Sequence, residues 1–79
     1  MIDFEDGARA GKSTALQLST APIVRAAILA SLPAARAEAR SWMKHGNQWH
    51  RDTAPYWLEF YDSFEASVAD MEAAAARRS

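Results

Sequence analysis

The segment of this sequence closest to a known chemical motif lies near its start, where two glycines precede a lysine, a serine and a threonine. Residues 7–14 read Gly-Ala-Arg-Ala-Gly-Lys-Ser-Thr. A phosphate-binding P-loop needs four residues between its glycines, so that successive backbone amides surround the phosphates. Here only three residues separate Gly7 from Gly11, and the chain leaves no room for the parallel sheet that supports such a loop. We therefore interpret this segment as a flexible basic turn that binds no nucleotide.

Two histidines and an aspartate form the second candidate for chemistry. His45, His50 and Asp52 lie close together in the sequence, and imidazole and carboxylate groups are zinc ligands. Their spacing matches no compact zinc motif, and a fourth ligand is not evident. With Glu59 they supply groups used in general acid–base catalysis, but no nucleophile, oxyanion hole or pocket accompanies them. We expect them to hydrogen-bond the connection over residues 46–53, and we predict no metal, no cofactor and no enzymatic activity.

The last third of the sequence has the clearest helical pattern. Residues 52–55 read Asp-Thr-Ala-Pro, in which a capping side chain precedes a proline, as at many helix starts. Apolar residues then recur at spacings of three and four, which predicts an amphipathic helix over residues 54–76. These residues form one apolar seam made of Trp57, Tyr61, Phe64, Val68, Met71 and Ala75.

The middle of the sequence predicts two shorter helices. Pro22 suits the first turn of a helix, whereas Pro33 removes a backbone hydrogen bond from any helix that contains it. The chain either kinks at Pro33 or begins a new helix capped by Ser31. We favour the second alternative, with helices over residues 21–31 and 32–45.

The first 20 residues have no dominant period. Apolar and polar residues alternate in two short stretches, which is compatible with a short β-hairpin, and an irregular arm is compatible as well. We therefore leave the structure of this N-terminal segment open between these two alternatives.

These elements together predict a mainly α fold. Because 79 residues support only one small core, we expect a single three-helix domain. The helices over residues 32–45 and 54–76 form a hairpin, and the helix over residues 21–31 packs across it. Trp42 and Trp57, one on each helix of the hairpin, are expected to pack together and fix its angle.

Charge is distributed unevenly along the chain. The formal net charge is −1, yet residues 7–51 carry a balance of +6 and residues 52–72 one of −6. Antiparallel packing of the hairpin would bring the basic and the acidic helices together, so we expect their charges to cancel largely where they meet. Four basic residues form a ridge beside the hairpin contact, namely Arg36, Arg40, Lys44 and Arg51.

The favoured functional hypothesis is a non-enzymatic protein-binding domain. An acidic helix can occupy a basic groove that normally receives DNA or RNA, and an exposed tryptophan is a common contact residue. In its specific form, the hypothesis is a phage or mobile-element protein that inhibits a host nucleoprotein complex stoichiometrically, as anti-CRISPR proteins do. The expected contact residues are Trp49, Glu59, Asp62, Glu65, Asp70 and Glu72.

Two alternatives remain open at this point. The basic ridge is typical of nucleic-acid-binding modules, and an apolar seam completed by a partner helix would fit a structural or assembly subunit. The absence of cysteine favours a reducing cytoplasm, and no apolar run is long enough to span a membrane. We expect a larger protein or nucleoprotein complex as the partner, with direct nucleic-acid binding less favoured and the chain itself a monomer or a dimer.

Overall fold

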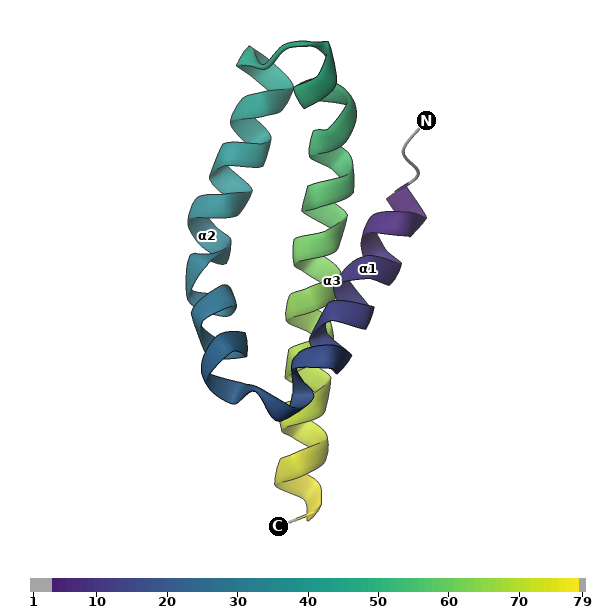
Figure 1. Cartoon of the computed structure of the whole chain (residues 1–79), viewed down its shortest axis with the longest axis vertical. Helices are drawn as coiled ribbons and strands as arrows, with labels where there is room; N and C mark the ends of the chain where they lie inside the picture. Colours follow the sequence, from purple (N-terminus) through teal and green to yellow (C-terminus); the bar gives the residue numbers. More distant parts are fainter. Residues whose placement is uncertain (1–3, 79) are drawn as a thin grey trace.

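The computed structural model describes residues 4–78 and contains three α-helices over that range. They are α1 (Phe4–Gln17), α2 (Pro22–His45) and α3 (Gln48–Arg78), and a turn of 3-10 helix, η1 (Leu18–Thr20), joins the first two. α2 and α3 form an antiparallel hairpin, and α1 lies along α3 and runs in the same direction (Figure 1). The predicted mainly α, three-helix domain is confirmed.

The other two helices are assembled on α3. α1 makes the more extensive contact with α3, α2 makes the second, and α1 and α2 have little contact with each other. The core consists of Ala15 from α1, Leu32 from α2, and Phe64 and Val68 from α3, each no more than 2% exposed. The apolar seam predicted for the last helix is therefore covered by both neighbouring helices at Phe64 and Val68.

Small residues bring the backbones of α1 and α3 into direct contact. Gly7, Gly11 and Ala15 recur every four residues and are all buried. A Cβ atom added at Gly7 would collide with the carbonyl oxygen of Tyr56, and one at Gly11 with that of Phe60. Small residues four positions apart allow two helices to approach this closely. The segment that we interpreted as a flexible basic turn is therefore a helix–helix contact.

The N-terminal segment is helical, so the β-hairpin or irregular arm that we predicted for residues 1–20 is wrong over Phe4–Gln17. Residues 1–3 lie outside the described part of the chain. The alternation of apolar and polar residues is a local signal, whereas packing on α3 selects the helix. A hydrogen bond supports this packing, because the Ser63 hydroxyl of α3 donates to the carbonyl oxygen of Ala8 at 2.6 Å.

α2 is a single helix, whereas we predicted two helices over residues 21–31 and 32–45. Pro33 lies inside α2 with its ring exposed to solvent. The Ser31 hydroxyl donates to the carbonyl oxygen three residues earlier at 2.7 Å, so it bonds to the preceding turn and caps no new helix. Packing of α2 on α3, with Leu32 buried next to the proline, offsets the backbone hydrogen bond that Pro33 removes.

α3 begins six residues before the helix that we predicted over residues 54–76. The reason is a reciprocal cap formed by Asn47 and His50. The side-chain Oδ1 of Asn47 accepts the His50 backbone N–H at 2.9 Å, and Nδ1 of His50 accepts the Asn47 backbone N–H at 3.3 Å. Pro55, which we assigned to the first turn, consequently lies inside the helix.

Candidate functional site

The acidic side chains of α3 remain on the surface of the folded chain. All six acids between residues 52 and 72 are exposed. At 100° per residue, four of them share one solvent-exposed arc of α3. We call this arc the acidic face, and it consists of Asp52, Glu59, Asp62 and Asp70. Glu65 and Glu72, the other two predicted contact acids, lie at the edge of the face that borders α2.

Asp52 is a member of the acidic face that we missed from the sequence. We assigned it to the cap of the predicted helix, whereas α3 begins earlier and carries Asp52 inside its second turn. Its Oδ1 accepts a hydrogen bond from Nε2 of Gln48 at 2.8 Å, and the side chain is still exposed. The Asn-x-x-His pattern at residues 47–50 was the signal that could have revealed the earlier helix start.

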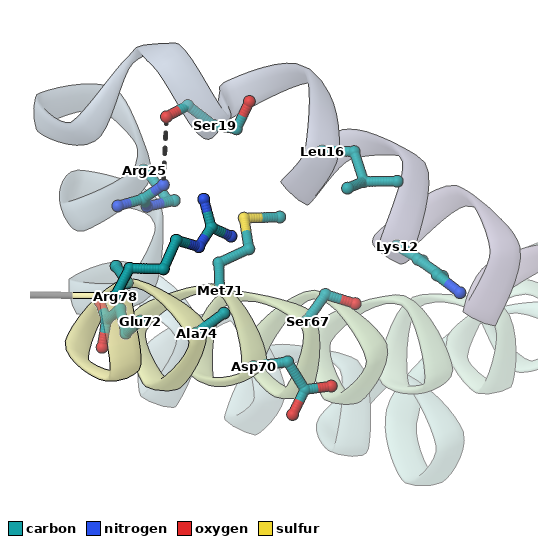
Figure 2. Close-up of a pocket in the computed structure, with 11 residues that line it drawn as sticks. Lys12, Leu16, Ser19, Arg25, Ser67, Asp70, Met71, Glu72, Ala74 and Arg78 are labelled. Carbon is teal, nitrogen blue, oxygen red and sulfur yellow. Dashed lines mark hydrogen bonds between the residues drawn. The ribbon is translucent and has the colours of Figure 1, made fainter.

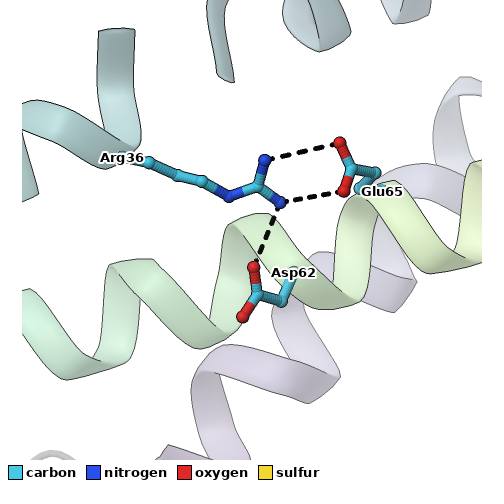
Figure 3. A network of polar contacts seen from close by, with 3 residues as sticks. All are labelled: Arg36, Asp62 and Glu65. Carbon is cyan, nitrogen blue, oxygen red and sulfur yellow. Dashed lines mark hydrogen bonds and ion pairs between the residues drawn. The ribbon is translucent and has the colours of Figure 1, made fainter. Parts of the chain in front are cut away.

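Arg36 of α2 is the cation that contacts the acids of α3 (Figure 3). Its Nη2 donates to Asp62 Oδ1 and to Glu65 Oε1, both at 3.1 Å, and its Nη1 donates to Glu65 Oε2 at 3.4 Å. The pKa of Arg36 lies above its usual value, chiefly because of the hydrogen bond with Glu65. Burial lowers this pKa, but the charge of Glu65 and the contact with Asp62 add to the hydrogen bond and outweigh it. Arg36 is 17% exposed, whereas Asp62 and Glu65 are 68% and 55% exposed. One cation is shared by two carboxylates, so this cluster stays negatively charged.

The rest of the basic ridge does not neutralise the acidic face. Arg40 and Lys44 are exposed, and within residues 4–78 neither forms an ion pair with an acid of α3. Arg51 donates from Nη1 to the carbonyl oxygen of Gly46 at 3.1 Å, which closes the connection between α2 and α3. The expected cancellation of charge is therefore limited to Arg36, and the four basic residues do not act as one surface.

Trp49 is held at the hairpin end of the molecule by two other rings. Its ring centroid lies 6.0 Å from that of Trp42 and 5.3 Å from that of His50. The Trp42 and His50 centroids are themselves 4.7 Å apart. Trp49 is nevertheless 59% exposed. A tryptophan that is fixed on one side and open on the other loses little conformational freedom when a partner binds it.

Trp57 does not pair with Trp42 as we expected. Among the described residues, its ring contacts are with neighbours on α3, including a stacked contact with Tyr61 at 6.2 Å. The early start of α3 places Trp49 beside the connection, whereas Trp57 lies two turns further along. Burial, and to a smaller extent the charge of Glu38, raises the pKa of Tyr61 above its usual value.

The histidine cluster has a local structural role. His50 caps α3, as described above, while His45 ends α2 and is exposed. In the part of the chain that the structure describes, no three histidine, cysteine, aspartate or glutamate side chains gather in a way that could hold a metal ion. Over the same part, none of the helices combines the length and the apolar character needed to cross a membrane.

Comparisons with protein-family models, with curated proteins and with solved structures found no match to this chain.

The Arg36 cluster makes a measurable contribution to the pairing of α2 with α3. We expect Arg36→Met to lower the free energy of unfolding by about 1 kcal/mol. Methionine keeps the apolar stem of the side chain but removes the guanidinium and with it both carboxylate contacts. In a double-mutant cycle with Glu65→Gln, the two effects should be less than additive, and the coupling should shrink at high salt. Urea unfolding followed by tryptophan fluorescence measures both.

Arg40→Met is the matched control for this cycle, because Arg40 lies one turn further along α2 without an acidic partner. It should leave the stability unchanged within about 0.5 kcal/mol. Additive effects of Arg36→Met and Glu65→Gln would show that the ion pair contributes nothing to the hairpin.

Proposed function

We propose that the chain is a non-enzymatic protein-binding domain whose contact surface is the acidic face of α3 together with Trp49. The observation that supports this most directly is that the acids of α3 stay exposed after folding, with Arg36 as their one cationic partner among residues 4–78. Complementary charge steers a protein toward its partner and excludes partners of like charge. The partner that fits this face is a protein with a basic groove.

The length of the acidic face suits a groove that binds nucleic acid. From Asp52 to Asp70 the face extends about 27 Å along the helix axis, at 1.5 Å per residue. That distance corresponds to about eight base pairs of duplex DNA. In its specific form, the proposal is a stoichiometric inhibitor of a nucleoprotein complex, of the anti-CRISPR type, encoded by a phage or mobile element.

Trp49 supplies the apolar part of the proposed contact. It lies one turn before Asp52 on α3, so the ring borders the start of the acidic face. Charged residues at an interface mainly set specificity and the rate of association, whereas buried aromatic anchors supply much of the affinity. We therefore place the strongest single contact of the partner at Trp49.

The two alternative functions have less support. A nucleic-acid-binding ridge would need Arg36 and Arg51, and both are engaged within the chain. An assembly subunit would need the seam of α3 to be open, whereas Phe64 and Val68 are covered by α1 and α2. The acidic face also has members engaged within the chain, Asp62 with Arg36 and Asp52 with Gln48, but all four of its side chains remain exposed.

A paired charge reversal tests the proposal. Glu59→Lys with Ala66→Lys reverses the charge in the middle of the acidic face and replaces no residue of the Arg36 cluster, and both positions are exposed. Arg40→Glu with Lys44→Glu is the matched control on the basic side. Each variant and the unaltered chain are used as bait in lysate of the source cells, with and without nuclease treatment, and captured proteins are quantified by mass spectrometry.

We expect the unaltered chain and the basic-side control to capture the same protein, and Glu59→Lys/Ala66→Lys or Trp49→Ala to lose it. The captured protein should itself bind nucleic acid, and the chain should displace that nucleic acid at one-to-one stoichiometry. Loss of capture with Arg40→Glu/Lys44→Glu, or after nuclease treatment of the lysate, would contradict the proposal and favour direct nucleic-acid binding.

A further inference from the structure

A second surface lies at the opposite end of the molecule, where α3 extends past the other two helices (Figure 1). A pocket of about 530 Å³ opens there between α3, the end of α1 and the start of α2. Figure 2 shows Met71 rising from α3 into this space, between Leu16 and Arg25. Residues 70–78 of α3, which line this pocket on one side and run to the end of the helix, are named the overhang.

Exposed apolar side chains lie at this end of the molecule. Leu16, Ile23 and Val24 are at least half exposed, and Ile23 reaches 85%. Leu16 lines the pocket, whereas Ile23 and Val24 lie at the start of α2, outside its lining. Several large apolar residues exposed at one place mark a site of protein contact.

The charges of the overhang identify a fitting partner. Asp70 and Glu72 precede a run of four alanines, and Arg77 and Arg78 follow it. This order is self-complementary, because an antiparallel second overhang brings the acids of each copy beside the arginines of the other. Within residues 4–78, none of these four side chains forms an ion pair in its own chain.

The helical positions of these residues agree with this pairing. Met71 and Ala74 face the pocket. Asp70 and Arg77 lie together at one side of this pocket-facing surface of the helix. In a two-fold antiparallel pair, equivalent flanks meet, so an axis near Ala74 places Asp70 of each copy beside Arg77 of the other. The alanines allow the two helices to approach closely.

The surface of the chain is larger than a compact monomer needs. Its accessible area is 5439 Å², whereas a monomer of this mass is expected to have about 4,700 Å². Its radius of gyration is 13.8 Å, against about 12 Å for a compact domain of this length. The chain is therefore more elongated than a compact domain of its length, with extents of 48 × 23 × 16 Å.

We infer that the overhang and the pocket beside it form a homodimer interface, in which the overhangs of two copies of this chain pair antiparallel about an axis near Ala74. The apolar side chains around the pocket supply the contact area, and the four charges set the antiparallel register. Asp70 is the one residue of the acidic face that lies at this interface, so Trp49, Asp52, Glu59 and Asp62 stay exposed in both copies.

Complementary charge variants test the dimer. Arg77→Glu/Arg78→Glu makes the overhang acidic throughout, and Asp70→Lys/Glu72→Lys makes it basic throughout. We expect the unaltered chain to shift from monomer to dimer with concentration in sedimentation velocity, and each variant to weaken self-association about tenfold or more. An equimolar mixture of the two variants should associate again, while Arg40→Glu/Lys44→Glu should behave as the unaltered chain does.

Two results would overturn the inference, namely an unaltered chain that stays monomeric over the whole concentration range, or a mixture of the variants that does not associate. The geometry has its own test, because the chain contains no cysteine. Under mild oxidation, Ala74→Cys should form a disulfide-linked dimer. Ala76→Cys, which lies about 200° around the same helix from Ala74, should remain monomeric. Equal cross-linking at both positions would exclude this interface.

Discussion

Replacing Gly11 with leucine is expected to detach α1 from α3 and to unfold most of the domain. Even the Cβ atom of alanine at this position would collide with the carbonyl oxygen of Phe60 and would lie 3.0 Å from the amide nitrogen of Phe64. Both are backbone atoms in the middle of a long helix, so they cannot turn aside as a side chain can. A leucine adds three further carbon atoms to this contact, and α1 has no other surface on which to pack.

Gly11→Ala tests the same contact with a smaller change, because its expected effect on stability is opposite to the usual effect of replacing glycine with alanine in a helix. In an exposed helix, alanine is more stable than glycine by about 1 kcal/mol. Here we expect the opposite, a loss of about 1–3 kcal/mol, because overpacking outweighs the gain in helix propensity. Urea unfolding followed by circular dichroism measures the difference. Gly7→Ala should have the same sign.

Ser13→Leu is the control for these variants, because Ser13 is exposed on the outer side of α1. It should change the stability by no more than about 0.5 kcal/mol. A Gly11→Ala variant that is more stable than the unaltered chain would show that the two backbones are not in contact.

The glycines also show why the N-terminal helix could not be predicted from the sequence. Glycine is a turn residue by local preference, and Gly7 and Gly11 together with Lys12 suggested a loop. Their role depends on Tyr56 and Phe60, which lie some 50 residues away in the chain. Local propensity carries no information about such a partner, whereas the spacing of four between small residues does carry it. That spacing was visible in the sequence and was interpreted through the wrong motif.

The hairpin and the seam of α3 could be predicted because their signals are local. The apolar spacing from Trp57 to Met71 fixes a helical face, and Phe64 and Val68 on that face are indeed buried, together with Thr53 and Ala54 nearer the start of α3. The boundaries were less accurate, because Pro33 was interpreted as the boundary between two helices and Pro55 as part of the first turn of the last one. Each proline lies within a helix whose flanking turns pack on a neighbour, so tertiary contacts outweigh the lost backbone hydrogen bond.

The residue types of the candidate site could be predicted from the sequence. Which basic side chains would neutralise its acids could not. Composition alone indicated an acidic helix opposite a basic one, and the acids are where the helical period places them. Which of the basic residues reaches the acids depends on the rotation of α2 about its axis, which only packing determines. Arg36 faces α3, whereas Arg40 and Lys44 are turned to solvent. The acidic face therefore keeps more of its charge than the sequence indicated.

Phe64→Ala is expected to disrupt the packing of both α1 and α2, although the residue belongs to neither. Phe64 is fully buried in one cluster with Ala15 of α1 and Leu32 of α2. Because α1 and α2 have little contact with each other, a cavity at Phe64 weakens both of their attachments to α3 at once. Truncation of a buried phenylalanine to alanine costs about 3–5 kcal/mol. A domain of this length has a total stability of only about 4–12 kcal/mol.

Thermal unfolding followed by circular dichroism should therefore show a Phe64→Ala chain that is partly unfolded at room temperature. Leu58→Ala, at a half-buried position of the same helix, should cost clearly less. Hydrogen exchange gives the sharper measurement, because it reports α1 and α2 separately. If Phe64 joins the two attachments, amide protection falls in α1 and α2 together. Protection that falls in one of them and persists in the other would mean that α3 holds its two neighbours by separate contacts, and that the domain has two small cores where we describe one.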